Sequence, residues 1–190
     1  MSNEIQIALL GIVGTLVGTI LGWVLNTLSQ RGRLNIFISS WIDKFEYNKV
    51  GYMTPSSSVA QTESYSYCLS LDLYNSSGTT KIMRNLEVIF LKDKTELNRS
   101  IPKDDSTKRY GTHTAYYDVI EPINIPPKTV LKIVVHEGYW KDELSFLWEV
   151  DRVFLKYTNE KNQEKRILIK KELYKNYFDN HRAEEQDNGQ

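Results

Sequence analysis

The side chains best able to do chemistry in this chain are its one cysteine, Cys68, and its three histidines, His113, His136 and His181. A thiol becomes a nucleophile when an imidazole and an orienting group approach it. The histidines lack the HxxxH spacing of a helical metal site, and the sequence offers no second thiolate. We therefore expect no metal ion and no cofactor, and we interpret Cys68 as a small packing residue of a strand.

Neighbouring carboxylates, another source of acid–base chemistry, occur at Asp104-Asp105 and Glu184-Glu185. Their surroundings are typical of a loop and of a polar tail, where carboxylates are solvated. The sequence contains neither a GxSxG turn nor a glycine-rich phosphate loop. Its net charge is zero and its basic residues are scattered, which does not suit a phosphate backbone. The sequence thus predicts a protein that is not an enzyme and does not bind nucleic acid.

An apolar run from Ile5 to Leu25 dominates the N-terminal part of the chain, and no charged residue follows it before Arg31. A helix needs about 20 apolar residues to cross a hydrocarbon core about 30 Å thick. A cleavable signal peptide would begin with basic residues, whereas this chain begins MSNE. A buried core helix would be amphipathic, and this run is apolar all round. We expect one transmembrane helix in residues 1–28 that anchors the chain in a lipid bilayer.

Small residues recur along one face of this helix and form the pattern GxxxGxxxG. The row comprises Gly11, Gly14, Gly18 and Gly22, flanked by Thr15 and Thr19. Residues at this spacing stack on one side of a helix, and their lack of bulk lets a second helix approach closely. Glycine is also commoner in membrane helices in general, and another membrane protein could use the same face. We expect homo-oligomers formed through this face.

Basic residues lie on the C-terminal side of the apolar run, at Arg31 and Arg33, whereas the N-terminal side carries only Glu4. Positively charged flanks of membrane helices remain in the cytoplasm. A lone cysteine also suits a reducing compartment. We therefore expect a single-pass protein of the cell membrane whose C-terminal domain is cytoplasmic.

Beyond a basic link at residues 29–33, the apolar pattern alternates. In residues 64–75, tyrosine and leucine occupy one parity while serine, cysteine and aspartate occupy the other, which predicts a strand with one buried and one wet face. Further strands are expected near residues 34–47, 86–92, 112–120, 129–136, 152–158 and 165–171. Residues 49–63 have the composition of a loop, and Pro126-Pro127 favours a crossover between sheets.

These strands predict a mainly β fold in which a transmembrane helix precedes an immunoglobulin-like β-sandwich of about seven to eight strands. The sandwich is expected in residues 34–172, with residues 142–150 as a short helix or turn between two strands. Residues 173–190 are expected to form a short C-terminal helix and then a disordered polar tail. The paired cysteines of true immunoglobulin domains are absent from the sequence, so the expectation concerns architecture.

Two functions are compatible with this organisation. The first is a membrane-anchored interaction or sensor module that binds an unknown cytoplasmic protein or ligand through an aromatic rim at Tyr139 and Trp140. The second is a membrane-disrupting effector, of a host-defence or toxin-like kind, whose helices oligomerise into a leak. The missing catalytic motifs and the glycine row favour the first.

Overall fold

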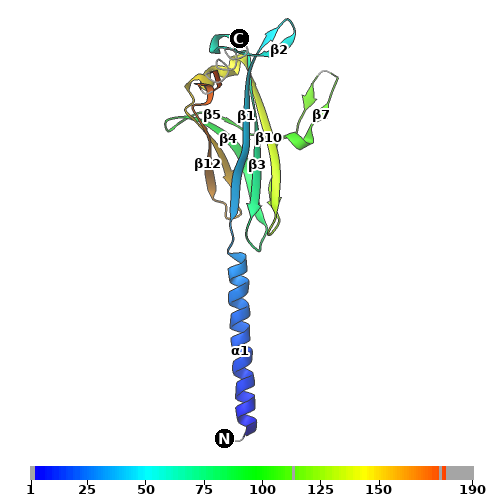
Figure 1. Cartoon of the computed structure of the whole chain (residues 1–190), viewed down its shortest axis with the longest axis vertical. Helices are drawn as coiled ribbons and strands as arrows, with labels where there is room; N and C mark the ends of the chain where they lie inside the picture. The colour runs from blue at the N-terminus through cyan, green and yellow to red at the C-terminus, as the bar shows by residue number, and fades with distance from the viewer. Residues whose placement is uncertain (1–2, 113, 176, 179–190) are drawn as a thin grey trace, which may run out of the picture.

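One long helix and a β-sandwich make up the molecule and are stacked end to end (Figure 1). The computed structural model describes residues 3–112, 114–175 and 177–178. Helix α1 (Asn3–Gln30) is long and apolar enough to cross a membrane, and none of its residues is buried by the rest of the chain. The helix runs through Gln30, so residues 31–33 alone connect it to the first strand.

The first sheet, called here the β3 sheet, is built around its central strand. Strand β3 pairs with β1 on one side and with β10 on the other, both antiparallel, and the full order is β2-β1-β3-β10-β6. The bounds are β1 (Leu34–Lys49), β2 (Tyr52–Pro55), β3 (Ser64–Asn75), β6 (Lys103–Asp104) and β10 (Val130–Trp140).

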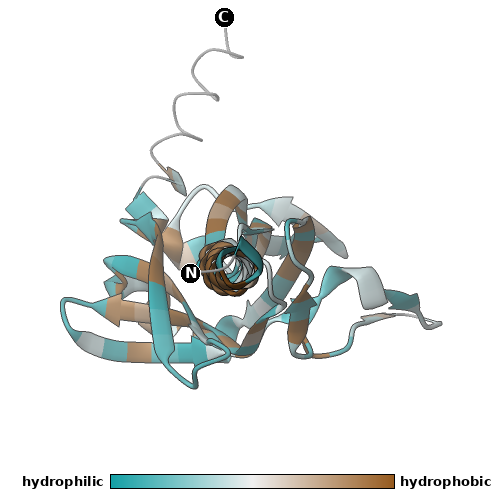
Figure 2. Ribbon diagram, turned by 90° about the horizontal axis from the view of Figure 1, so that it is seen from below, coloured by the Kyte–Doolittle hydropathy of each residue, from teal (hydrophilic) through white to brown (hydrophobic). Residues whose placement is uncertain are grey.

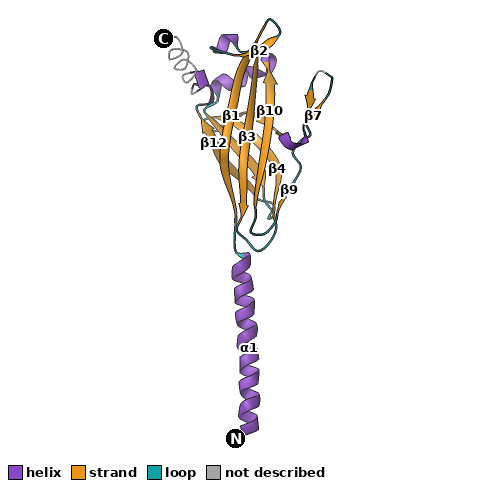
Figure 3. Ribbon diagram, turned by 45° about the vertical axis from the view of Figure 1, so that its right-hand side comes forward, coloured by secondary structure: helices purple, strands orange, loops and turns teal. Residues whose placement is uncertain are grey.

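The second sheet, called here the β4 sheet, has the order β12-β11-β4-β5, and β9 also pairs with β4. Its bounds are β4 (Lys81–Lys92), β5 (Thr95–Ser100), β9 (Ile123–Ile125), β11 (Arg152–Thr158) and β12 (Glu164–Lys171). The remaining elements are the hairpin β7 (Arg109–Tyr110) and β8 (Ala115–Tyr116) and the 3-10 segments η1 (Val59–Gln61), η2 (Asp105–Thr107) and η3 (Lys141–Glu149). Figure 3 shows the two sheets face to face above α1.

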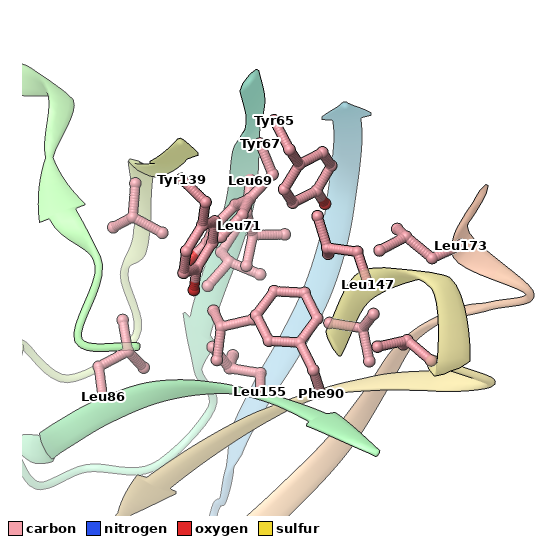
Figure 4. Close-up of a cluster of buried hydrophobic side chains, with 14 of the residues drawn as sticks. Tyr65, Tyr67, Leu69, Leu71, Leu86, Phe90, Tyr139, Leu147, Leu155 and Leu173 are labelled. Carbon is pink, nitrogen blue, oxygen red and sulfur yellow. The ribbon is translucent and has the colours of Figure 1, made fainter. Parts of the chain in front are cut away.

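Alternation along β3 decides which residues lie between the sheets. The alternate tyrosine and leucine side chains of β3 are each at most 1% exposed, whereas the serine and cysteine side chains between them face outward. Figure 4 shows the inward side chains meeting Phe90 of β4 and Leu155 of β11. The rings of Tyr67 and Phe90 have centroids 6.1 Å apart. Burying one such side chain stabilises the fold by roughly 1.5–3 kcal/mol, so this row accounts for much of the packing energy.

The architecture confirms the expected immunoglobulin-like sandwich. Strand β1 begins at Leu34, and its imperfect alternation has a structural cause, since the register shifts between Ile38 and Ser40. The crossover at Pro126-Pro127 also occurs, because β9 belongs to the β4 sheet and β10 to the β3 sheet. The segment 142–150 lies almost entirely in η3, whose Leu144 and Leu147 are buried.

Residues 49–63 and 112–120 differ from the sequence-based expectation. Residues 112–120 were expected to form a sandwich strand, but among the described residues of this segment the strand is limited to Ala115–Tyr116, in a hairpin that projects from the sandwich (Figure 1), and Val119 forms an isolated bridge with Lys103. Its tyrosines are exposed, so the β-forming residues bury no core surface that could hold them in a sheet. The expected loop at residues 49–63 contains β2, which forms a hairpin with the end of β1.

The C-terminal segment is helical from Leu173 onward within the described residues, and Leu173, Tyr177 and Phe178 are buried. Phe45 of β1 contacts the rings of both Tyr177 and Phe178, with centroids 4.7 and 5.3 Å apart. The short C-terminal helix therefore packs against the core. The predicted disordered tail lies outside the described residues.

Candidate functional site

The glycine face of α1, defined by Gly11, Gly14, Gly18 and Gly22, is uncovered. Apart from the neighbouring backbone of α1 itself, a Cβ placed on any of these four glycines would meet no atom of the described chain within 4 Å. The hydroxyls of Thr15 and Thr19 donate to the carbonyl oxygens of Gly11 and Thr15, each at 2.8 Å. Because these hydrogens return to their own helix, a partner helix would be held by close backbone packing and not by threonine donors.

A close backbone contact joins α1 to the sandwich, and we call it the junction. The amide of Gly78 donates to the carbonyl of Ser29 at 3.0 Å, and the amide of Ser76 donates to the carbonyl of Arg33 at 3.0 Å. The hydroxyl of Ser76 accepts from the amide of Arg33 at 3.0 Å. A Cβ on Gly32 would lie 2.2 Å from the carbonyl carbon and oxygen of Ser76. The helix is thus docked on the β3–β4 turn, and only glycine fits at position 32.

Asn75 holds this turn from inside the protein. Its fully buried amide nitrogen lies 2.8, 2.9 and 3.0 Å from the carbonyl oxygens of Thr79, Ile125 and Pro126. Its side-chain oxygen accepts from the amide and the hydroxyl of Ser77, at 2.9 and 2.6 Å. One side chain therefore connects the β3–β4 turn to the end of β9. No local sequence pattern identifies this role of Asn75, because two of its three carbonyl partners lie 50 and 51 residues away.

Arg31 and Arg33, which carry the topology prediction, both lie exposed in the three-residue connection between α1 and β1. The carbonyl and amide of Arg33 take part in the junction, so its backbone position is fixed while its side chain remains accessible. Figure 2 looks along α1 toward this end of the sandwich. The orientation of the domain relative to a membrane remains a prediction.

The outward face of the β3 sheet carries a groove whose floor is the small-residue parity of β3. Ser64, Ser66 and Cys68 form this floor. Two adjoining hollows, of about 270 and 240 Å³, share Ser66 and Gly138. We call them together the outer groove. Their floor is low because small side chains face outward between the larger residues of β1 and β10.

Cys68 and His136 are direct cross-strand neighbours in the outer groove, and Asp105 lies 3.4 Å from Nδ1 of His136. This is the association of thiol, imidazole and carboxylate that nucleophilic catalysis would require. Burial, and secondarily Asp105, raises the pKa of the Cys68 thiol, while burial lowers the pKa of His136. An activated thiolate–imidazolium pair needs the opposite shifts. These directions favour a neutral thiol beside a neutral imidazole, and both residues line the outer groove.

The predicted aromatic rim is divided by strand alternation. Trp140 is 65% exposed and forms a wall of the outer groove together with Met53 of β2. Tyr139 is 8% exposed, and its ring packs against Phe146 and Tyr65 with centroids 5.3 and 6.1 Å apart. The rim prediction is therefore corrected for Tyr139, which belongs to the core. Adjacent residues of a strand point to opposite faces, so both rings could not serve one surface.

These features define the class of this protein as an immunoglobulin-like β-sandwich carried on an N-terminal apolar helix. The model of the YopI Ig-like domain family matches residues 32–170, and the chain belongs to that family. The match begins at Gly32, so it includes Gly32, Arg33 and the β3–β4 turn of the junction as well as the sandwich strands.

The chain is also similar to individual proteins and solved structures. The SPbeta prophage-derived uncharacterized protein YopI of Bacillus subtilis is 28% identical over 152 residues, which cover 76% of this chain and 84% of that protein. Among solved structures, the putative ApaA protein of Bordetella pertussis matches with 8% identity and a TM-score of 0.36 over 73% of this chain and 89% of that chain. An uncharacterized β-sandwich protein of Clostridium difficile matches with 13% identity and a TM-score of 0.34 over 74% and 91%.

Proposed function

We propose that this protein is a membrane-anchored, non-enzymatic interaction module. The observation that carries the proposal is α1, whose 28 residues expose an apolar surface that nothing in the described chain covers. Such a surface would associate with other apolar surfaces in water, whereas a bilayer solvates it. The helix is proposed to span the cell membrane once, and Arg31 and Arg33 favour a cytoplasmic sandwich.

The glycine face is proposed to bring copies of the chain together. Its four glycines are open to contact, and in hydrocarbon the close approach of two backbones is the main source of helix association. Because the junction fixes α1 to the sandwich, the pairing of two helices would also hold their two sandwiches next to each other. Neighbouring sandwiches would then present their outer grooves together and bind a partner with raised valency.

Replacing Gly18 with leucine tests the association. We expect Gly18→Leu to abolish most of the dimer or oligomer signal of the full chain in a bacterial two-hybrid or in-membrane crosslinking assay, because a bulky side chain holds the facing backbones apart. The matched control is Ile20→Leu, which lies about 200° around the helix and leaves the face unchanged. Equal signals from the two variants would mean that the glycines reflect only the usual composition of membrane helices and do not mediate association.

The outer groove is proposed as the binding surface for a cytoplasmic protein. Its hollows, of about 270 and 240 Å³, are smaller than the roughly 300–1,000 Å³ of small-molecule pockets, and they adjoin along the strand direction. Two such hollows accommodate successive side chains of an extended polypeptide better than one compact ligand. Trp140 offers the large rigid ring that interfaces use as an anchor.

Truncating Trp140 tests this surface. We expect Trp140→Ala to leave the stability of the domain within about 0.5 kcal/mol of wild type, since the ring is 65% exposed. It should nevertheless remove a partner protein that copurifies with the full chain from the native host's membranes in detergent. Tyr110→Ala is the control, because it removes an 82% exposed ring from the projecting β7–β8 hairpin. If Trp140→Ala still copurifies with the partner, or if Tyr110→Ala loses the partner equally, the outer groove is not the binding surface.

A further inference from the structure

The end of the sandwich that adjoins α1 concentrates positive charge that is dispersed in the sequence. Four segments converge there, namely residues 31–33, 76–81, 126–129 and 159–165, because β3, β4, β10, β11 and β12 all start or end beside the first residues of β1. The segments contain six basic residues, Arg31, Arg33, Lys81, Lys128, Lys161 and Lys165, and two acidic ones, Glu160 and Glu164.

Both acidic residues are already engaged. Glu160 pairs with Lys81 at 2.7 Å, and Glu164 pairs with Lys156 at 2.8 Å. Lys161 and Lys165 are exposed and form no ion pair within the described part of the chain. The surface next to α1 is therefore positively charged and available to an anion.

A hollow of about 350 Å³ lies within this basic surface. It is bordered by Gly32 and Arg33 of the connection and by Lys161 and Lys165 of the β11–β12 hairpin. Its lining also includes the amide residues Asn159 and Gln163 and the ion pair of Lys81 with Glu160, so the charge of that carboxylate is already compensated. Such a lining offers positive charge and amide donors to the oxygens of a phosphate group.

The position of the hollow relative to α1 identifies its occupant. Helix α1 continues from Leu25, the end of the apolar run, to Gln30, and residues 31 and 32 then lead to the hollow, which places it roughly 10 Å from the hydrocarbon. The headgroup region of one leaflet is about 5–7 Å thick, and lysine and arginine side chains bridge the remaining distance. We propose that this hollow binds the headgroup of an anionic phospholipid from the bilayer that α1 crosses. The inference rests on the proposed membrane anchoring.

Native mass spectrometry of the full chain, released from nanodiscs of phosphatidylcholine with about one quarter phosphatidylglycerol, tests the proposal. We expect retained phosphatidylglycerol to exceed its bulk share, and the double variant Lys161→Gln/Lys165→Gln to lower this enrichment by about fivefold or more. The control variant Lys94→Gln/Lys141→Gln removes the same charge from exposed lysines at the opposite end and should keep the enrichment. Excess inorganic phosphate should not displace the lipid.

Equal enrichment in the two double variants overturns the proposal, and so does displacement by phosphate alone. The same spectra report the oligomeric state, which the lysine substitutions should leave unchanged. A loss of oligomers with retained lipid enrichment would contradict the proposed self-association while supporting the headgroup site. A chain that does not insert into nanodiscs at all would instead contradict the membrane anchor, so the two failures are distinguishable.

Discussion

Replacing Asn75 with aspartate is expected to lower the free energy of unfolding by about 3–5 kcal/mol at neutral pH, although the two side chains have nearly the same shape. The amide nitrogen faces the carbonyl oxygens of Thr79, Ile125 and Pro126, and a carboxylate would set negative charge against all three. Because the position is fully buried, water cannot solvate that charge. Urea denaturation of the full chain in detergent measures the loss.

The pH dependence of this effect follows from the same contacts. Burial among carbonyl oxygens disfavours the carboxylate, so the introduced group's pKa would exceed the value of about 3.9 of an exposed aspartate. Its destabilising effect relative to wild type should therefore be largest at neutral pH and should decline toward about pH 4, where the protonated group can donate one hydrogen bond. Asn124→Asp, at an exposed position of β9, is the control and should cost less than about 0.5 kcal/mol. Similar losses from the two variants would refute the role given to Asn75.

Adding one methyl group at Gly32 is expected to separate α1 from the sandwich. In Gly32→Ala the new Cβ would lie 2.2 Å from the carbonyl carbon and oxygen of Ser76, so the two backbones must move apart. This movement breaks the hydrogen bonds from Ser76 to Arg33 and from Gly78 to Ser29. Together with the bond from the Arg33 amide to the Ser76 hydroxyl, these bonds and their packing correspond to roughly 2–4 kcal/mol. The amides of Ser76 and Gly78 should then exchange with solvent about 100-fold faster or more.

Hydrogen exchange of the full chain in nanodiscs measures this change residue by residue. Gly138→Ala provides the control, because a Cβ there would meet its nearest neighbour, the carbonyl oxygen of Tyr65, at an ordinary 3.7 Å. The control should leave the protection of both junction amides as in wild type. Unchanged protection in Gly32→Ala would mean that the helix and the sandwich are joined by a flexible link, and the proposed transmission of helix pairing to the sandwich would be lost with it.

The apolar helix and the sandwich could be predicted because each depends on a local repeat. An uninterrupted apolar run predicts α1 without reference to the rest of the chain, and period-two alternation predicts β3 with its buried and outward faces. The strands expected near residues 152–158 and 165–171 correspond in the same way to β11 and β12. The same reasoning gave a wrong prediction for residues 112–120, because β-forming residues make a sandwich strand only where a second surface buries them.

The parts of the candidate sites that sequence reasoning missed depend on contacts between distant segments. Strand alternation could have separated Tyr139 from Trp140, had the strand been extended beyond residue 136 to its end at Trp140. By contrast, no local signal distinguishes Gly32 from any other linker glycine, because its restriction arises from Ser76, 44 positions away. The pairing of Cys68 with His136 likewise follows from the register of β3 with β10.

The sequence by itself determined that a membrane-length apolar helix precedes a β-sandwich, and which parity of β3 is buried, since hydrophobic length and periodicity are properties of consecutive residues. Only the tertiary structure decided that the helix is docked on the β3–β4 turn and that Asn75 ties that turn to β9. Only it gathered Lys161 and Lys165 beside Arg33. The physical reason is that antiparallel pairing brings the ends of strands distant in sequence to one end of the sandwich, where charge and hydrogen bonding act through space.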